Sequence, residues 1–416
     1  MMSTKECKMA KNLRFVDLFA GIGGFHQALE QLGCRCVCAS EIDPHCIETY
    51  KKNFPDTPIV GDINECFDEL PDFDIMCGGF PCQPFSKAGK QEGFKDKKSG
   101  NLFYVLMDIL KRHPECKFVI LENVKNLADN SQNWEKIQAA LQEQDFYVTD
   151  EPIILSPHQI GIPQIRERVY ILGIRKGIRD DSKLPNGSIH MEDLGKLFDE
   201  EKVCKGNDAK KILTKNVDRK YIISKQQKDA LLMWMEFKNG TSFETLGVPI
   251  WVEYFGYGLS DKAFETFVDY KGQSIDEMFE WKKRFVRKNR AFYKKHKTFI
   301  DDWIKKYDVL NLPMVYKKFE WNCGKNRDIK NTIIQFRQSG IRVKRLNYFP
   351  ALVAINNTPV IYDDEFNDFR MITPREAANL QSFKEDYDFN GNPQIYKQLG
   401  NAVNVEIVKI LAEKLF

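Results

Sequence analysis

The chain has 416 residues, of which 43% are hydrophobic and 12% aromatic, and its formal net charge is +3 at pH 7. These values predict a folded chain of about two domains, in which any attraction to a polyanion comes from local patches. The apolar runs are too short to span a bilayer, and residues 1–12 lack the hydrophobic core of a signal peptide. We therefore expect a cytoplasmic protein without a membrane span.

The cysteines predict neither a disulfide framework nor a metal centre. The chain has 11 cysteines without paired spacing, which fits reduced thiols. Cys34, Cys36 and Cys38 lie on one predicted strand, but no histidine cluster or C-x-x-C pair completes a zinc site there. We expect no metal ion.

A predicted strand, a glycine turn and a helix follow one another near the N-terminus. Residues 15–19 are apolar, glycines recur from Gly21 to Gly24, and residues 25–32 have a helical pattern. Glycines allow positive φ and close backbone approach, and the helix N-terminus offers free N–H groups. A dinucleotide motif would have a third glycine where His26 stands, so the turn predicts a ligand site that departs from that motif.

Two carboxylates follow the ends of later predicted strands. The strand at residues 34–39 runs into Glu41, placed about 20 residues after the glycine turn to hydrogen-bond a ribose diol. Asp62 and Ile63 end another strand, where a carboxylate beside an apolar side chain suits the amino group and face of an adenine. Each acid alone also fits a solvated strand end, but their order favours a nucleoside-bearing cofactor.

One cysteine stands between prolines directly after the predicted buried strand 73–77. Pro81 and Pro84 disfavour helix around Cys82, which predicts a rigid turn at the strand's carboxyl end, where open α/β sheets bind ligands. A buried structural thiol is the ordinary alternative for a lone cysteine. Glycines and lysines in residues 83–100 indicate a loop that can approach phosphates.

Further polar groups stand at the predicted strand 118–121 and in the segment 162–172. Glu122 and Asn123 directly follow the first of these, a position that also suits a helix cap or a solvated turn. In the second, alternation places one amide and two guanidinium groups on a single strand face. These groups belong to Gln164, Arg166 and Arg168. Two guanidiniums suit a fixed anion or carbonyl, and a solvated ion-paired face is the alternative.

Taken in chain order, these segments resemble the cytosine-C5 DNA methyltransferases. The resemblance covers roughly residues 13–175 and 370–412, and eight motifs occur in family order. They are residues 15–25, 41–43, 61–63, 81–83, 121–124, 164–168, 373–376 and 400–403. The resemblance implies an α/β fold: a Rossmann-like S-adenosylmethionine-dependent methyltransferase domain with an inserted, smaller target-recognition domain.

The resemblance also implies boundaries and a reaction. Residues 1–176 and 396–416 would form the catalytic, S-adenosylmethionine-binding domain, and residues 177–395 the target-recognition domain and hinge. The enzyme would methylate C5 of a cytosine rotated out of a specific duplex sequence. Cys82 matches the family's nucleophile, which adds to C6 of the cytosine. Glu122 matches the carboxylate that holds N3 and the exocyclic amine, and Arg168 matches the residue that contacts O2. The residues implied to complete the catalytic site by bracing its loop and phosphate are Asn123, Arg166 and Gln164.

Cofactor and DNA contacts follow from the same resemblance. The residues matched to the S-adenosylmethionine site are Phe19, Gly21, Ile22, Gly23, Gly24, Glu41, Ile42, Asp62, Ile63, Pro81, Leu102, Asn401 and Val403. The expected DNA contacts are Gln83, Ser86, Lys90, Gln164, Arg337, Arg342 and Arg345. Gln83 and Ser86 would fill the space that the rotated base leaves, and the three later arginines stand in a basic segment that suits a groove or backbone contact.

Aromatic and basic residues interleave between residues 281 and 330, which indicates a DNA-facing surface or an ordinary amphipathic helical segment. Two other functions stay open: an RNA (tRNA) cytosine-5 methyltransferase and a catalytically silent DNA-binding relative. The expected partner is double-stranded DNA, bound by a monomer. The sequence leaves open whether a cognate restriction endonuclease acts on the same site.

Overall fold

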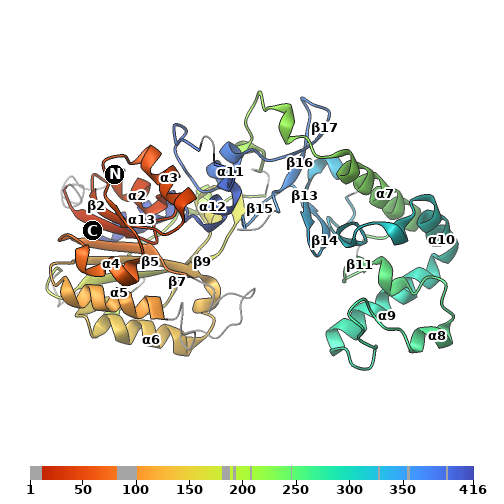
Figure 1. Cartoon of the computed structure of the whole chain (residues 1–416), viewed down its shortest axis with the longest axis horizontal. Coiled ribbons are helices and arrows are strands. Elements are labelled where there is room, and N and C mark those ends of the chain that lie inside the picture. The colour runs from red at the N-terminus through yellow and green to blue at the C-terminus, as the bar shows by residue number, and fades with distance from the viewer. Residues whose placement is uncertain are drawn as a thin grey trace. The chain divides into compact units, whose positions relative to one another are not determined.

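A computed structural model describes most of the chain, which divides into two compact units (Figure 1). The described residues are 12–81, 101–179, 188–190, 194–206, 209–244, 246–326, 328–353, 357–389 and 392–416. Unit 1 comprises Met1–Ile212, Pro350–Ile355 and Pro374–Phe416, and unit 2 comprises Leu213–Phe349 and Asn356–Thr373. Residues 177–212, 350–355 and 374–395, which the sequence placed with the recognition domain, thus group with unit 1.

Unit 1 is built on a mixed sheet that has nine strands among the described residues. The strand order is β10-β6-β9-β5-β4-β1-β2-β3, and β7 also pairs with β9. Their bounds are β1 (Arg14–Leu18), β2 (Arg35–Ser40), β3 (Ile59–Val60), β4 (Ile75–Gly79), β5 (Phe118–Val124), β6 (Phe146–Thr149), β7 (Ile153–Leu155), β9 (Arg168–Arg175) and β10 (Ser188–Ile189). Pairing is parallel from β3 to β5, and β9 runs antiparallel to β5. The chain winds outward from β1 to β3 and then returns to β4, so ligands are expected at the carboxyl ends of β1 and β4.

Helices cover both faces of this sheet (Figure 1). They are α2 (Gly24–Glu30), α3 (Pro44–Asn53), α4 (Ile63–Cys66), α5 (Asn101–Arg112), α6 (Ser131–Gln142), α11 (Pro374–Leu380), α12 (Ile395–Asn401) and α13 (Val405–Leu415). Leu106 of α5 and Ile137 of α6 join Val16, Leu18 and Val119 of the strands in one buried core. The C-terminal helix α13 packs against α2, so segments from both ends of the chain build unit 1.

Unit 2 holds a six-stranded sheet among its described residues, in the order β11-β12-β14-β13-β16-β17. The strands are β11 (Ile250–Trp251), β12 (Lys318–Asn322), β13 (Thr332–Arg337), β14 (Gly340–Arg345), β16 (Val360–Asp363) and β17 (Asp368–Met371). The helices are α7 (Lys225–Thr241), α8 (Asp261–Glu265), α9 (Glu280–Lys295) and α10 (Lys297–Lys306). Two short strands, β8 (Gln164–Ile165) and β15 (Phe349–Pro350), lie outside both large sheets.

Most aromatic side chains between residues 281 and 330 belong to the core of unit 2. Trp303 and Phe319 are buried with Trp234, whose ring stacks on that of Phe319 with centroids 4.8 Å apart. Trp281, by contrast, is exposed. The interleaved pattern therefore reflects helices and strands that bury aromatic rings on one side, rather than an aromatic surface.

Several strands extend further than the sequence predicted. β4 covers Ile75–Gly79 instead of residues 73–77, and β5 runs to Val124, so Glu122 and Asn123 lie within the strand rather than after it. Gly78 and Gly79 pair with Leu121 and Glu122, which explains how glycines continue the ladder. The single strand expected at residues 162–172 is divided into β8 and β9. No helix among the described residues is long and apolar enough to cross a membrane.

Gly78 leaves room for no side chain, and its replacement tests the packing of β4 against β1. A Cβ at this position would lie 2.4 Å from the Leu18 carbonyl oxygen. We expect Gly78→Ala to lower the free energy of unfolding by about 1–3 kcal/mol, the usual cost of overpacking. Urea unfolding measures the change. Gly61→Ala is the matched control, because a Cβ there meets nothing within 4 Å and the variant should be neutral or slightly stabilised.

Candidate active site

The glycine turn after β1 has an unusual backbone. Phe19, Gly21 and Gly23 all have positive φ, of 55°, 55° and 79°. A Cβ on Gly23 would lie 2.4 Å from the Phe54 ring, and one on Gly24 would lie 2.7 Å from Val403 Cγ2. A Cβ on Gly21 would meet nothing within 4 Å. Two glycines are thus required by packing, whereas the backbone at Gly21 faces open space in which a ligand could lie.

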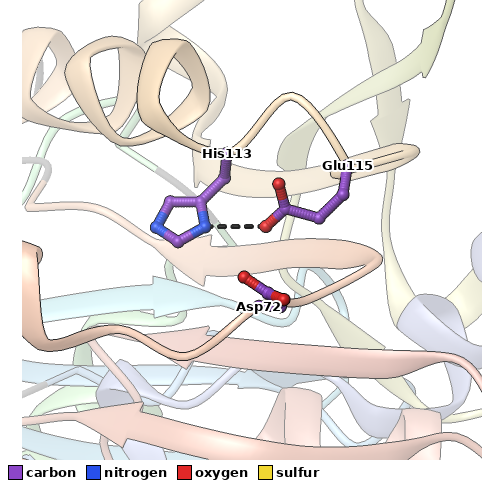
Figure 2. Close-up of side chains that lie close together, drawn as sticks. All are labelled: Asp72, His113 and Glu115. Atoms are coloured by element: carbon purple, nitrogen blue, oxygen red, sulfur yellow. Dashed lines mark hydrogen bonds and ion pairs between the residues drawn. The ribbon is translucent and has the colours of Figure 1, made fainter.

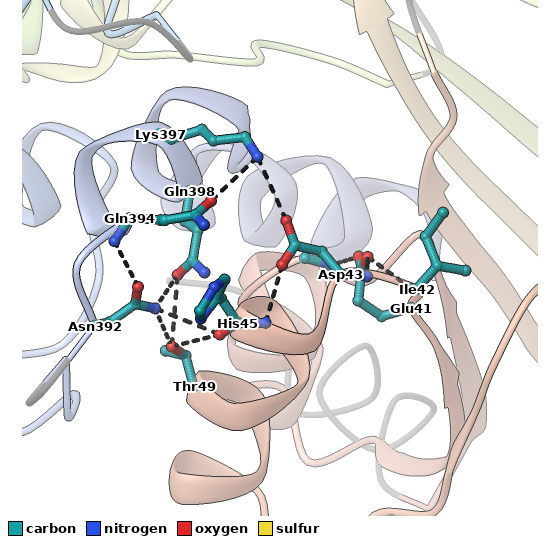
Figure 3. Close-up of polar contacts among 10 residues, drawn as sticks. Glu41, Ile42, Asp43, His45, Thr49, Asn392, Gln394, Lys397 and Gln398 are labelled. Atoms are coloured by element: carbon teal, nitrogen blue, oxygen red, sulfur yellow. Dashed lines mark hydrogen bonds and ion pairs between the residues drawn. The ribbon is translucent and has the colours of Figure 1, made fainter.

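The Glu41 carboxylate lies beside this turn at the end of β2 (Figure 3). Its Oε2 accepts a hydrogen bond from the Gly21 N–H at 2.7 Å, and its Oε1 accepts from the N–H groups of Ile42 and Asp43, both at 2.8 Å. Backbone donors therefore fix the orientation of this carboxylate. Ile42, the next residue, is 69% exposed, an unusual environment for an isoleucine.

The C-terminal motif is held against α3 by a polar network (Figure 3). Asp43 caps α3 by accepting from the His45 N–H, and Lys397 Nζ lies 3.5 Å from its other oxygen. Asn392 Nδ2 donates to Thr49 Oγ1 and Gln398 Oε1, both at 2.6 Å. The contacts of Lys397 with Asp43 and of Asn392 with Thr49 join segments more than 340 residues apart, which a single sequence cannot indicate.

The other matched cofactor residues lie around the same strand ends. Asp62 caps α4, Ile63 is buried, and the Ile22 carbonyl accepts a hydrogen bond from the Tyr387 hydroxyl. Phe19 and Leu102 pack at the edge of the sheet core. Pro81 is half-buried, Val403 is buried and Asn401 is exposed.

A buried polar layer lies beneath the turn, and no functional role was predicted for its members. His26 stacks on Phe54 with ring centroids 3.6 Å apart, and its Nδ1 lies 2.7 Å from the Tyr50 hydroxyl. Burial lowers the pKa of His26 to about 3. The carboxyl of Asp17 is fully buried nearby, which raises its pKa well above the ordinary value. His26, which displaces the dinucleotide motif's third glycine, is therefore a neutral core residue.

The pair Glu122 and Arg168 lies at the junction of β5 and β9. Arg168 Nε is 2.9 Å from Glu122 Oε1, and Glu122 is 7% exposed. Burial raises the pKa of Glu122, although the guanidiniums of Arg168 and Arg166 oppose the shift. A Cβ on Gly79 would lie 3.3 Å from Glu122 Oε2, a tight contact that glycine avoids.

Asn123 ties β5 to the segment that precedes Cys82. Its Nδ2 donates to the Phe80 carbonyl at 3.2 Å, and its Oδ1 accepts from the Val124 N–H at 2.8 Å. Cys82, Gln83, Ser86 and Lys90 lie outside the described residues. The contact to Phe80 nonetheless fixes where the chain leaves β4, two residues before the cysteine.

Arg166 and Gln164 are buried and hold other parts of unit 1. Arg166 donates to the carbonyls of Leu352 and Ala402 at 3.1 and 3.0 Å, and Gln164 Nε2 donates to the Pro350 carbonyl at 3.4 Å. Both side chains therefore brace backbone segments of unit 1. Gln164 has no exposed surface in this structure with which to meet DNA.

Of the three arginines proposed to contact DNA in unit 2, Arg345 is exposed at the end of β14. Arg337 and Arg342 both form ion pairs with Glu320. They lie on the sheet itself rather than in a flexible loop.

One group of side chains within the described residues has the composition of a metal site: Asp72, His113 and Glu115 (Figure 2). Asp72 precedes β4, and His113 and Glu115 precede β5. These residues therefore lie at the amino ends of the two strands, whereas Glu122 lies near the carboxyl end of β5. His113 Nδ1 already lies 2.8 Å from Glu115 Oε1. The group is separate from the candidate active site.

Comparison with solved structures shows the fold. A variant of Spodoptera frugiperda DNMT2 has a TM-score of 0.56 at 18% identity, covering 97% of this chain and 100% of that one. The Entamoeba histolytica methyltransferase EhMeth has a TM-score of 0.52 at 17% identity, with 98% of both chains covered. The expected Rossmann-like methyltransferase fold is confirmed.

Sequence comparison shows the family. A model described as C-5 cytosine-specific DNA methylase matches residues 13–416. The Type II methyltransferase M.AluI of Cellulosimicrobium cellulans is 31% identical, covering 95% of this chain and 90% of that protein. M.BanI of Aneurinibacillus aneurinilyticus is 32% identical, covering 97% and 96%. This chain belongs to the C-5 cytosine-specific DNA methylase family, and its enzyme class is DNA (cytosine-5-)-methyltransferase.

The buried His26 predicts a measurable pH dependence of stability. Because its pKa is about 3 in the folded chain and ordinarily near 6.5, the unfolded chain binds more protons between these values. Stability is therefore complete above about pH 6.5 and falls on acidification, by up to about 1.4 kcal/mol per pH unit. We expect urea unfolding at pH 7 and pH 5 to show a smaller pH effect in His26→Gln than in the wild type. An equal slope in His26→Gln and the wild type would contradict the assignment.

Proposed function

We propose that this enzyme transfers a methyl group from S-adenosylmethionine to C5 of a cytosine rotated out of duplex DNA, through a covalent bond between Cys82 and C6. The observation that carries the proposal is the buried Glu122–Arg168 pair, placed beside Gly79 on the strand that leads to Cys82. Membership of the family indicates that cytosine is the substrate base. The carboxyl group of Glu122 and the guanidinium of Arg168 can form hydrogen bonds with the edge of its ring.

The cofactor site fits S-adenosylmethionine in its chemistry. Glu41 offers carboxylate oxygens to a ribose diol, the exposed Ile42 side chain offers an apolar surface to an adenine, and Asp62 can accept from its amino group. The open space at Gly21 allows a ligand to approach the backbone. When bound, S-adenosylmethionine supplies an electrophilic methyl group on its sulfonium.

Cys82 and Glu122 would activate the cytosine together. The Cys82 thiolate forms a bond to C6, and the displaced π electrons make C5 nucleophilic. Glu122, whose pKa is raised by burial, can donate a proton at N3 and relieve the charge that the addition places in the ring. Arg168 would donate to O2. After methylation, loss of the C5 proton to a base, expulsion of the thiolate and return of the N3 proton to Glu122 restore the C5–C6 double bond and the neutral base.

The target must leave the helix before this chemistry, at a cost of roughly a few kcal/mol in stacking and pairing. Gln83 and Ser86 are proposed to fill the space that it leaves, with Lys90 on the phosphate backbone. Unit 2 would read the surrounding duplex. A monomer is sufficient, since one active site acts on one base.

The curated relatives are named Type II methyltransferases, which supports a role in restriction-modification beside a cognate endonuclease. Bisulfite sequencing of DNA from cells that express the protein tests the function and gives the modified sequence. Methyl incorporation into duplex DNA and into tRNA, measured side by side, separates the DNA enzyme from an RNA methyltransferase. Incorporation into tRNA alone would overturn the proposal.

Replacing the nucleophile should stop the reaction at its first step. We expect Cys82→Ala to abolish methyl transfer and to leave S-adenosylmethionine binding within a few fold of the wild type, as measured by calorimetry. Duplex DNA that contains 5-fluorocytosine should form a covalent complex with the wild type and none with the variant. Turnover by Cys82→Ala would exclude the covalent mechanism.

Replacing Glu122 should affect the chemistry more than binding. Glu122→Gln keeps the shape but cannot donate a proton, so kcat should fall by about 10²–10⁴-fold while the Kd for DNA changes little. Single-turnover methyl transfer gives the rate. Glu135→Gln, an exposed change on α6, serves as the control and should retain the wild-type rate.

Loss of the Glu41 carboxylate should weaken binding of the cofactor and leave binding of DNA unchanged. A hydrogen bond to a charged group contributes about 1.5–3 kcal/mol, so Glu41→Ala should raise the Kd for S-adenosylmethionine by about 10–150-fold. Equilibrium binding of cofactor and of duplex DNA, measured separately, tests this. An unchanged cofactor Kd would remove Glu41 from the site.

A further inference from the structure

The sheet of unit 2 presents two chemically different faces. Phe319, Trp321, Ile341 and Val343 point into the aromatic core. Because side chains alternate along a strand, the residues between them share the opposite face, and strand pairing aligns Glu320 with Arg342. The charged side chains of β12, β13 and β14 on this face, which we name the polar face, are Lys318, Glu320, Arg337, Arg342 and Lys344.

Glu320 binds both arginines of the polar face. Its Oε1 lies 2.9 Å from Arg337 Nη2, and its Oε2 lies 2.6 Å from Arg342 Nε. The side chains of Glu320 and Arg337 are 14% and 16% exposed, whereas that of Arg342 is 36% exposed. One carboxylate therefore connects guanidiniums from two neighbouring strands, and the outer one reaches solvent.

The polar face carries more positive charge than its carboxylate neutralises. Burial would raise the pKa of Glu320, but hydrogen bonds from Arg342 and Arg337 hold it below the ordinary value, so it stays ionised. Burial, together with the nearby arginines, lowers the pKa of Lys318 and of Lys344. Crowded cations repel one another, and an anionic partner relieves that repulsion.

The guanidinium of Arg342 keeps donors that Glu320 does not use. A guanidinium has five N–H donors in a planar fork, but Nε and Nη2 of Arg337 are both buried, so the more exposed Arg342 is the one with donors that a partner can reach. Arg342 is bound through Nε, the edge of the fork nearest its own strand. A guanidinium held at one edge loses little further freedom when its other edge binds, which favours a planar, two-point acceptor.

We propose that the polar face binds duplex DNA and that Glu320 is a positioning residue for sequence discrimination. Together with Arg337, it fixes Arg342 so that the free edge of this guanidinium meets acceptors arranged in pairs, as on the major-groove edge of guanine. Phosphate oxygens offer the same chemistry without sequence information. The inference rests on the proposed function, since it assumes that the enzyme acts on DNA.

A role in neutralising charge and a role in positioning the arginines predict opposite effects of Glu320→Gln on DNA binding. If Glu320 only neutralises positive charge, its removal strengthens binding to every duplex equally. If it positions the arginines, binding to the methylated sequence weakens relative to other sequences, while binding to unrelated DNA is unchanged or tighter. The ratio of the two affinities therefore separates the roles.

The experiment uses the full chain and a duplex of about 30 bp that contains the sequence identified by bisulfite sequencing. The Kd and kcat/KM are measured for this duplex and for duplexes in which each base pair of the site is changed in turn. We expect Glu320→Gln to lower discrimination at one or more G·C pairs by about 10-fold or more. Arg342→Lys keeps the charge but loses the fork, and should reproduce the loss at the same position.

Glu236→Gln is the matched control, because Glu236 forms a comparable pair with Lys306 on the helical side of unit 2. It should retain wild-type discrimination. Equal weakening at all positions in Glu320→Gln and Arg342→Lys would assign the arginines to phosphates and overturn the positioning role. Unchanged discrimination in Glu320→Gln and Arg342→Lys would do the same. If Glu320→Gln does not fold by circular dichroism, Arg342→Lys decides the outcome.

A wild-type enzyme that methylates no duplex would instead refute the proposed function. Methylation by the wild type together with full discrimination by the variants would refute only the inference about Glu320. The two failures are therefore distinguishable.

Discussion

The burial of Glu122 against Arg168 is the interaction on which the candidate active site depends. Removing two charged groups from water is costly, and the cost is recovered only when geometry and hydrogen bonding are good. Here the antiparallel pairing of β5 with β9 sets Val124 opposite Arg168, which brings the guanidinium Nε within 2.9 Å of the carboxylate two residues earlier on β5. The antiparallel strand β9 thus begins beside the carboxyl end of β5 and supplies the cation there.

Strand β5 also determines what surrounds the Glu122–Arg168 pair. Gly79, aligned with Glu122 on β4, leaves space beside the second carboxylate oxygen, and Asn123 fixes the carbonyl of Phe80. Arg166, just before β9, reaches the carbonyl of Ala402 in the C-terminal motif. Contacts distant in sequence therefore converge on the carboxyl ends of β4 and β5.

Local patterns in the sequence predicted the βα units well because those units depend on neighbouring residues. The helix at Val405–Leu415 forms as expected, and its Asn404 cap accepts from the Ile407 N–H. The strand ends were less predictable, because Gly78 and Gly79 discourage a strand locally and are retained in one by pairing with β5. Propensity is a weak guide where tertiary contacts decide.

Long-range contacts account for most of what the sequence did not reveal. The burial of Arg166 and Gln164 depends on segments near residues 350 and 402, which no local pattern connects to β8 and β9. His26 looked like a defect in a dinucleotide motif, yet it fills the space under the turn by stacking on Phe54. The shared partner of Arg337 and Arg342 is Glu320, which lies beside Arg342 because β12 pairs with β14, a pairing that no local pattern indicates.

Three glutamates in this chain show how surroundings assign different tasks to one side chain. Glu41 is oriented by backbone N–H groups and has carboxylate chemistry suited to a diol. Glu122 has one arginine at ion-pair distance, and burial outweighs that attraction, so its pKa rises and it can carry a proton to a base. Glu320 has two arginines, whose hydrogen bonds outweigh burial, so its pKa falls and it stays charged. Since a proton donor must be able to hold a proton and a positioning anion must not, the balance between burial and hydrogen bonds from guanidiniums separates the role proposed for Glu122 from that proposed for Glu320.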